Sequence, residues 1–497
     1  MRPRWIRIGF RLAAVLLAVA PFVLIEAGLA LLGWGGEEID HDPFVGFSSV
    51  RPLFVPTADG SRYEIAPSRR LFFCPESFAR PKPPGEVRIF CLGGSTVQGR
   101  PFAIETSFTT FLEINLRSAD PSRRWEVVNC GGISYASYRL VPILREVLGY
   151  RPDLIVLYTG HNEFLEDREY GHLRDTPAVV AGAIGYTTRL RTCALLRRAY
   201  RGLAGSFGGA RAPGVPILSA EVDARLDHRG GLAKYHRDDA WRRDVVRHFA
   251  CNLERMVRGA ARTGVPVILI NPASNLRDCP PFKGEGRAGL SPELRRRWVS
   301  LCDRARREPD GRRAVTILRE AIAIDDQHAG LHYLLAKRLD GVRRSAEARI
   351  AYLRAKELDV CPLRMLEEMH QALLEIARRT ETPVVDARRL VEARSRDGIP
   401  GGYLLLDHVH PSLAGHRLIA DAITDELIRR RTVRPRAGWQ ERRDAATDKH
   451  LASLGAFYYA KGRARLKALK EWAAGRVIPP TTRARPLRAG RVGRRRP

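Results

Sequence analysis

The chain has 497 residues, with 84 Lys and Arg against 55 Asp and Glu, which leaves a surplus of 29 positive charges. This length is enough for one large core and for more than one structural unit. The basic excess favours anionic partners such as phosphate, acidic polymers or anionic lipid. The sequence has no zinc-ligand spacing, no RNA-recognition aromatic motif and no recognition helix, so we do not expect it to bind nucleic acid.

The cysteines give no sign of a metal site. There are eight, at positions 74, 91, 130, 193, 251, 279, 302 and 361, without a Cys-x-x-Cys pair or the spacing of zinc ligands. We therefore predict neither a metal nor a cofactor. The spacings do not indicate a disulfide framework either, although one or two bridges remain open.

Residues 1–35 have the pattern of a signal anchor. Four arginines precede an apolar stretch from Leu12 to Trp34 whose only charged residue is Glu26. At ~1.5 Å per residue this stretch is long enough to cross a bilayer, and a carboxylate inside it is expected to contact another helix. The basic flank predicts that everything after the anchor lies outside the bacterial cytoplasmic membrane, in the periplasm. A cleaved signal peptide and a buried core helix are the competing interpretations.

From Glu86 onward, short apolar runs alternate with helical segments. Three runs end in polar or glycine-rich loops: VRIFCLGGST, WEVVNCGG and DLIVLYTGHNEF. Two more follow later in the chain, VPVILINPAS and TPVVDARR. This alternation predicts an α/β fold in which helices cover both faces of a parallel sheet. Ligands of such sheets bind beyond the carboxyl ends of the strands, where these polar loops converge.

The α/β domain is expected in two parts, residues 86–290 and 361–430. Residues 36–85 before it are rich in Pro, Phe and Arg without a steady period, and we predict an irregular lead-in there. After the domain, residues 431–497 are predicted to form a helical region that ends in a basic tail. The last 16 residues, Thr482–Pro497, contain seven Arg and no acidic residue, which favours disorder.

Residues 291–360, between the two parts of the domain, are predicted to be an Arg-rich helical insertion. Three of its residues have counterparts 34 positions later: Ala314, Leu318 and Ala321 recur as Ala348, Tyr352 and Ala355. That period is typical of tetratricopeptide repeats, which offer a surface to protein partners. An ordinary helical hairpin is the alternative, because such arrays usually need about three repeats.

Ser95 is the candidate nucleophile. It follows Gly93 and Gly94 directly after the first predicted strand, where glycines allow a tight turn that presents the hydroxyl at the start of a helix. A serine hydroxyl also needs a base and donors for the developing oxyanion. Taken alone, a Gly-Gly-Ser-Thr turn equally fits a phosphate-binding turn or a helix N-cap.

The segment DHVHPSLAGHRLIA, beyond the last predicted strand, supplies a candidate base. Asp407 lies three residues before His410, a spacing that lets a carboxylate orient an imidazole and stabilise its charged form. His408 is the competing histidine, and an ordinary surface turn is the competing structure.

GHNE, at the end of the third strand, supplies a candidate oxyanion donor. The side-chain amide of Asn162 can point across the ends of the strands toward Ser95. Alternatively, Asn162 only caps the following helix. His161 and Glu163 are interpreted as supports of the loop.

The motifs GGST, NCGGIS, GHNE and DHVH occur in the order of the four sequence blocks of the SGNH (GDSL-like) hydrolase superfamily, which this chain resembles over roughly 86–290 and 361–430. The resemblance implies a flavodoxin-like three-layer α/β/α sandwich. It also implies a catalytic triad of Ser95, Asp407 and His410. The first block reads Gly-Gly-Ser-Thr in place of Gly-Asp-Ser, which leaves the nucleophile unchanged.

The resemblance further implies three oxyanion donors, the backbone amides of Ser95 and Ser134 and the side chain of Asn162. The second block departs from the family pattern because Ser134 stands where the family has a glycine. Its backbone donor survives the change. Gly131 or Gly132 would be the donor if the loop were shifted.

The order of anchor, hydrolase domain and repeat-like insertion resembles bacterial envelope proteins, some of whose relatives act on acetylated polysaccharides. We therefore predict a serine esterase that cleaves O-acyl or acetyl esters, with a carbohydrate as one candidate substrate. An envelope polysaccharide O-acetyltransferase with the same triad is one alternative. A partner-binding scaffold without catalysis is the other.

Overall fold

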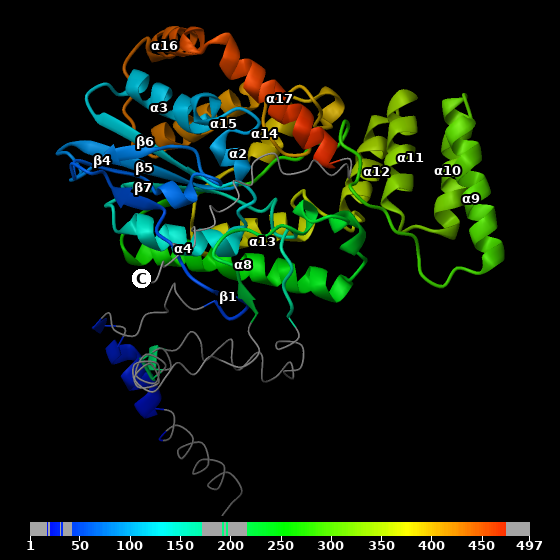
Figure 1. The fold of residues 1–497 in the computed structure, drawn as a ribbon, viewed down its shortest axis with the longest axis horizontal. Helices are drawn as coiled ribbons and strands as arrows, with labels where there is room; N and C mark the ends of the chain where they lie inside the picture. Colours follow the sequence, from blue (N-terminus) through cyan, green and yellow to red (C-terminus); the bar gives the residue numbers. More distant parts are fainter. Residues whose placement is uncertain are drawn as a thin grey trace, which may run out of the picture.

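The centre of the molecule is a five-stranded parallel sheet (Figure 1). The structure is a computed structural model, and it describes residues 17, 20–29, 31–32, 42–170, 191–192, 195–196 and 216–473. The strands of the sheet are β5 (Glu86–Gly93), β6 (Arg124–Gly131), β7 (Leu154–Tyr158), β9 (Val267–Ile270) and β10 (Val384–Val385). Each strand falls in one of the five apolar runs, so the prediction of an α/β fold with a parallel sheet is confirmed.

The strands lie in the spatial order β6-β5-β7-β9-β10. Numbered along the chain this is 2-1-3-4-5, the order of flavodoxin-like folds. The chain leaves β5 toward one edge and then crosses back to place β7 on the other side of β5. Beyond the carboxyl end of β5 the connections on its two sides run in opposite directions, and sheets of this topology bind ligands at that switch point.

Helices cover both faces of the sheet (Figure 1). One face carries α3 (Phe108–Ala119), α15 (Leu413–Arg429) and α16 (Trp439–Ser453), and the other carries α4 (Ser137–Leu148), α8 (Asp239–Arg262) and α13 (Glu367–Arg379). Alternate residues of each strand join the two cores. On β7, for example, Ile155 and Leu157 face the α4 side, whereas Leu154 and Val156 face the α3 side.

Part of the predicted irregular lead-in is an antiparallel sheet. Its strands are β2 (Phe54–Pro56), β3 (Arg62–Ile65) and β4 (Ser77–Ala79), paired in that order. The strands are only three or four residues long, too short for a clear alternation of apolar and polar residues. Phe54 and Phe78 nevertheless pack into the core on the α4 side.

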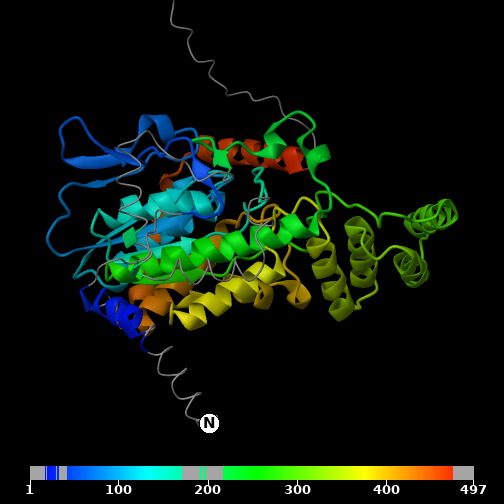
Figure 2. The same cartoon turned by 90° about the horizontal axis from the view of Figure 1, so that it is seen from below.

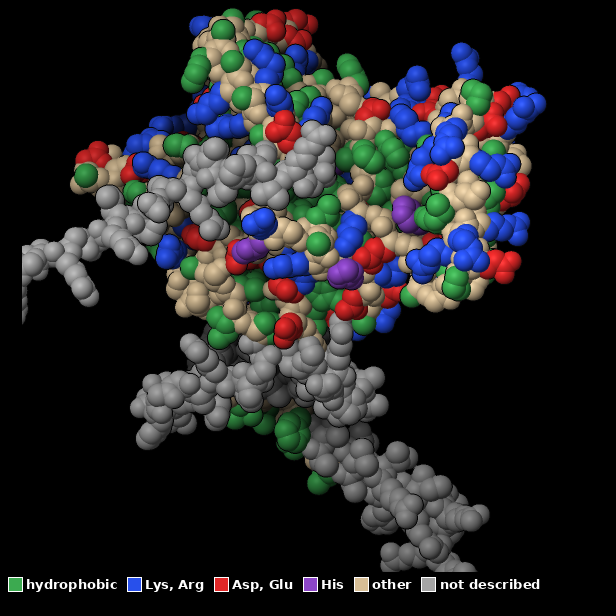
Figure 3. Space-filling view, turned by 45° about the vertical axis from the view of Figure 1, so that its right-hand side comes forward, with side chains coloured by type: hydrophobic (Ala, Val, Ile, Leu, Met, Phe, Trp, Pro, Cys, Tyr) green, Lys and Arg blue, Asp and Glu red, His purple; other side chains and the backbone are tan. Residues whose placement is uncertain are grey.

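The insertion consists of four successive helices, α9 (Pro292–Arg307), α10 (Gly311–Ile324), α11 (Ala329–Gly341) and α12 (Ser345–Glu357). They extend to one side of the sandwich (Figure 2). On the face seen in Figure 3, Lys and Arg side chains gather over them. The small and large residues that recur at 34 positions are buried in α10 and α12. The helical character matches the expectation, and the assignment to tetratricopeptide repeats remains a prediction.

The C-terminal helical region divides into α16 and α17 (Ala456–Ala473), separated by Leu454 and Gly455. The predicted disordered tail lies outside the described residues. The predicted anchor also lies largely outside them. Among the described residues, no helix combines the length and apolar composition needed to cross a bilayer. Glu26 accepts hydrogen bonds from the backbone N–H groups of Arg191 at 2.9 Å and Thr192 at 2.8 Å, so it does contact another segment.

Candidate active site

Ser95 stands at the carboxyl end of the central strand. It is the first residue of the short helix α2 (Ser95–Gln98), which follows β5 after Gly94. Two glycines are required here because the turn is tightly enclosed. A Cβ on Gly93 would collide with the carbonyl oxygen of Tyr158 on β7, and a Cβ on Gly94 would lie 2.6 Å from the side-chain nitrogen of Asn162. The Ser95 hydroxyl is thereby held just beyond the carboxyl end of the sheet.

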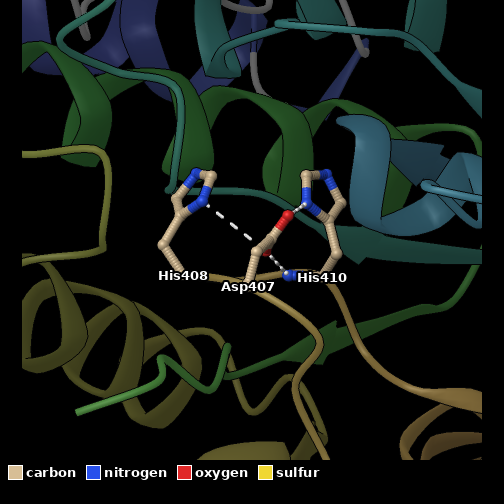
Figure 4. Close-up of side chains that lie close together, drawn as sticks. All are labelled: Asp407, His408 and His410. Atoms are coloured by element: carbon tan, nitrogen blue, oxygen red, sulfur yellow. Dashed lines mark hydrogen bonds and ion pairs between the residues drawn. The ribbon is translucent and has the colours of Figure 1, made fainter. Parts of the chain in front are cut away.

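His410 joins Ser95 to Asp407. His410 Nε2 lies 2.7 Å from Ser95 Oγ, and His410 Nδ1 lies 2.7 Å from Asp407 Oδ2. The other carboxylate oxygen of Asp407 accepts the backbone N–H groups of Val409 at 3.0 Å and of His410 itself at 2.9 Å. Figure 4 shows the carboxylate of Asp407 against the ring of His410. Ser95 and the Asp407–His410 pair, which lie more than 300 positions apart in sequence, therefore form one continuous hydrogen-bonded chain.

The environment keeps Asp407 ionised. Burial by itself raises the pKa of Asp407, but the interactions with His410 and His408 and the backbone hydrogen bond outweigh it, and the net pKa lies well below the usual range. With Asp407 ionised, the proton on Nδ1 of His410 points at the carboxylate. Nε2 is then free to accept the proton of Ser95.

His408, the competing histidine, does not reach Ser95 in this arrangement. Its Nδ1 lies 3.5 Å from Asp407 Oδ1 without forming a hydrogen bond, and its ring meets Phe282 edge-on. Burial lowers the pKa of His408 to about 4, so its ring is neutral near pH 7. The structure thus places His410, and not His408, against the candidate nucleophile.

The same segment contains the atoms of a metal-site pattern. Ligand-type atoms of Asp407, His408 and His410 lie within 4.8 Å of one another. However, both ring nitrogens of His410 already take part in hydrogen bonds, to Asp407 and to Ser95. A cation at this cluster would have to break one of them, so the arrangement fits proton transfer better than metal binding.

Asn162 lies beside the turn that carries Ser95. One N–H of its side-chain amide donates to the carbonyl oxygen of Tyr135 at 3.0 Å. This bond fixes the orientation of the amide and leaves its second N–H available. Burial of Tyr135 in the core holds that carbonyl in place. Sequence reasoning did not find Tyr135, because a backbone carbonyl carries no residue-type signal.

Ser134 adopts the left-handed backbone conformation, with φ of +63°. A glycine adopts this conformation without a steric penalty, which explains why a glycine suits this position. Within the described part of the chain, the backbone N–H groups of Ser134 and Ser95 donate to no acceptor. Both are therefore free to bind a substrate oxygen.

The alternative donors in the second block are already engaged. The N–H of Gly131 donates to Asn129 Oδ1 at 2.9 Å, and the N–H of Gly132 donates to the carbonyl oxygen of Gly93 at 3.0 Å. The geometry thus favours Ser134 over either glycine. The side-chain amide of Asn129 also donates to the carbonyl oxygen of Val97 in α2, and this bond helps to hold the turn that carries Ser95.

The remaining residues of GHNE support the loop, as the sequence indicated. The carboxylate of Glu163 accepts the backbone N–H and the hydroxyl of Ser137, at 2.7 and 2.9 Å, at the start of α4. His161 Nδ1 accepts the backbone N–H of Met365 at 3.2 Å. Burial first, and then the neighbouring His408 and His410, hold the pKa of His161 well below its usual value, so this ring is neutral.

Comparisons with known proteins give matches among solved structures. No protein-family model and no curated protein matches the chain. Among solved structures, a lipase/acylhydrolase from Enterococcus faecalis is similar at 14% identity and a TM-score of 0.32, covering 71% of this chain and 100% of its own. An acetylxylan esterase from Geobacillus stearothermophilus is similar at 13% identity and a TM-score of 0.30, covering 69% of this chain and 94% of its own. At this level of similarity the functional inference has to come from the side chains.

Proposed function

We propose that the protein is a serine hydrolase of the SGNH type that cleaves O-acyl esters through a Ser-His-Asp triad. The observation that carries the proposal is the hydrogen-bonded chain from Ser95 through His410 to Asp407, with 2.7 Å at each link. These residue types at these distances are the requirement for activating an alcohol near neutral pH. The site lies at the carboxyl end of β5, where sheets of this topology bind ligands.

In the proposed mechanism, Ser95 Oγ attacks the ester carbonyl while His410 Nε2 takes the hydroxyl proton. The ionised Asp407 stabilises the resulting imidazolium and keeps the ring in position. His410 then returns the proton to the alcohol oxygen that leaves. The acyl group remains on Ser95 until water, activated by the same imidazole, releases it.

In this proposal, three hydrogen-bond donors stabilise the negative charge that develops on the carbonyl oxygen. They are the backbone N–H groups of Ser95 and Ser134 and the free amide N–H of Asn162. The support for this assignment is that these donors have no competing acceptor, whereas those of Gly131 and Gly132 do. Fixed donors of this kind contribute about 3–4 kcal/mol each to stabilising the transition state.

The substrate class in this proposal is an acylated or acetylated compound, with a carbohydrate ester as the first candidate. The catalytic domain is proposed to act outside the cytoplasmic membrane, anchored by the N-terminal segment. The helical insertion, with its basic surface, is proposed to bind a protein partner. If a sugar hydroxyl enters in place of water, the same acyl-enzyme step makes the protein an O-acetyltransferase.

The test is hydrolysis of p-nitrophenyl acetate by the purified full-length chain, comparing wild type with Ser95→Ala and His410→Ala. Both variants are expected to lose at least about 10³-fold in kcat, because a triad acts as a unit. His408→Gln is the matched control, a neighbouring buried histidine that does not contact Ser95. It is expected to lose less than about tenfold.

Mass spectrometry of the protein during turnover gives a second readout, the mass of an acetyl group on wild type and none on Ser95→Ala. Addition of a polysaccharide acceptor separates hydrolysis from acyl transfer, because only a transferase moves the acetyl group to the polymer. Wild-type rates in both triad variants would rule out the triad. If the wild-type protein has no esterase activity and its insertion binds a protein partner specifically, the scaffold alternative is favoured.

A further inference from the structure

Arg100 is a charged residue next to the candidate nucleophile that the proposed mechanism does not use. Its backbone N–H donates to the carbonyl oxygen of Ser95 at 3.1 Å, so the backbone of Arg100 lies about one helical turn beyond the nucleophile. The residue is only partly exposed. Within the described part of the chain, its guanidinium group forms no hydrogen bond and no ion pair.

By contrast, two buried arginines of this protein form ion pairs with carboxylates. Arg277 pairs with both carboxylate oxygens of Asp340 at 2.7 and 3.0 Å, and Arg88 pairs with Glu86 at 2.6 Å. A guanidinium withdrawn from water needs such partners, because its five donors and its charge are otherwise poorly compensated. Within the described residues Arg100 lacks such partners, although it lies only five positions after the candidate nucleophile.

A second guanidinium lies close by, brought from the far end of the chain by α17. Arg465 Nη1 donates to the carbonyl oxygen of Phe102 at 2.7 Å. The helix is fixed on both sides of this contact. Tyr458 accepts the backbone N–H of Ala103 at 3.2 Å, and Trp472 packs against the buried cluster that includes Leu363. Helix α17 therefore runs along the end of the sandwich where α2 begins (Figure 1).

The electrostatic environment of Arg100 is consistent with these contacts. Burial lowers the pKa of Arg100, and the positive charge of Arg465 lowers it further, while Asp407 and Asp227 act in the opposite direction. Arg100 thus interacts electrostatically both with the carboxylate of the triad and with Arg465. Two like charges held together in a partly buried place destabilise each other until an anion lies between them.

We propose that Arg100 and Arg465 form an anion subsite beside Ser95, and that the natural substrate carries an oxyanion, a carboxylate or a sulfate, close to its ester. This substrate class rests on the proposed esterase function. Guanidinium groups bind such oxyanions through paired charge-assisted hydrogen bonds, and a neutral substrate offers no anionic partner for them. An acylated acidic polysaccharide, with uronic-acid or sulfated sugars, has this chemistry.

The subsite is tested by binding, so that its failure is distinct from a failure of the esterase function. The full-length chain with Ser95→Ala is titrated calorimetrically with trigalacturonate, with inorganic sulfate and with the neutral sugar xylotriose. Trigalacturonate or sulfate is expected to bind and xylotriose is not. The affinity for the anion should fall as salt rises, because exposed charges are screened.

Arg100→Gln in the same background is expected to weaken anion binding at least about tenfold, a difference of about 1.4 kcal/mol. Arg465→Gln should have a similar effect, with thermal unfolding as the check that α17 stays in place. Arg463→Gln is the matched control, since it removes the same charge from an exposed position of the same helix.

Binding of trigalacturonate but not sulfate identifies a carboxylated ligand, and the reverse identifies a sulfated one. Either result, lost in Arg100→Gln and kept in Arg463→Gln, supports the subsite. The proposal is overturned if neither anion binds, if xylotriose binds equally well, or if Arg463→Gln weakens binding as much as Arg100→Gln does.

Discussion

Replacing Asp407 by asparagine is the sharpest perturbation of the proposed triad. The two side chains have the same shape, so the amide oxygen of Asn still accepts the backbone N–H groups of Val409 and His410. The local loop is therefore retained. What changes is the contact at 2.7 Å with His410 Nδ1, where an amide nitrogen replaces a carboxylate oxygen.

The magnitude follows from the charge. In the transition state His410 is a cation, and an anion about 4 Å from it is worth about 4 kcal/mol at an effective dielectric constant of about 20. That loss corresponds to roughly 10³-fold in rate. Where the amide N–H faces Nδ1, the ring must also adopt the wrong tautomer, with Nε2 protonated and unable to accept from Ser95. We therefore expect kcat to fall by about 10³–10⁴-fold.

The assay is steady-state hydrolysis of p-nitrophenyl acetate, with thermal unfolding as the check of folding. The loss is expected in kcat and in kcat/KM alike, because the interaction is made in the transition state and not with the bound ester. A folded Asp407→Asn protein that keeps more than about a tenth of the wild-type kcat would falsify the role assigned to the carboxylate.

Three further results are expected. Asn162→Ala should lower kcat by about 10²–10³-fold, because it removes a side-chain donor. Ser134→Gly should keep kcat within about threefold, because it retains the backbone donor at a φ that suits glycine. Equal losses of the single-turnover rate in the two variants would contradict the assignment. Gly94→Ala should lower kcat at least about tenfold with little change in KM, since its Cβ would lie 2.6 Å from the Asn162 amide, and an unchanged kcat would show that the amide orientation does not matter. His416, whose pKa burial lowers to about 3, should reduce stability as pH falls. The imidazole of His416 binds a proton below about pH 6.5 in the unfolded chain but only near pH 3 in the folded chain, so the free energy of unfolding should be roughly 2 kcal/mol lower at pH 5 than at pH 7.5. In chemical denaturation, His416→Gln should remove that part of the pH dependence. The same pH dependence in both proteins would exclude His416 as its source.

Local sequence patterns were sufficient for the framework of the fold. Each strand of the central sheet is a short apolar run that ends in a polar loop, and buried parallel strands produce that pattern directly. The pairing of Asp407 with His410 is also local, because the two residues lie on one turn three positions apart. Ser95 and Asn162 were placed at neighbouring strand ends, and parallel strands bring such ends to one edge of the sheet.

Long-range packing decided the parts of the fold and of the site that local sequence patterns do not show. The strands β2–β4 are too short to show a period, and they exist because Phe54 and Phe78 complete a core built by other segments. The choice of Ser134 over Gly131 and Gly132 depends on which N–H groups are already bonded, a property of the closed loop that residue types do not encode. The meeting of Arg465 with the backbone of Phe102, 363 positions away, depends on where α17 packs. Residue types and periods act over a few positions, so the sequence alone determined the central strands, their helices and the reactive groups. Only the packed chain decided which short strands form, which donors are free and which distant segments meet.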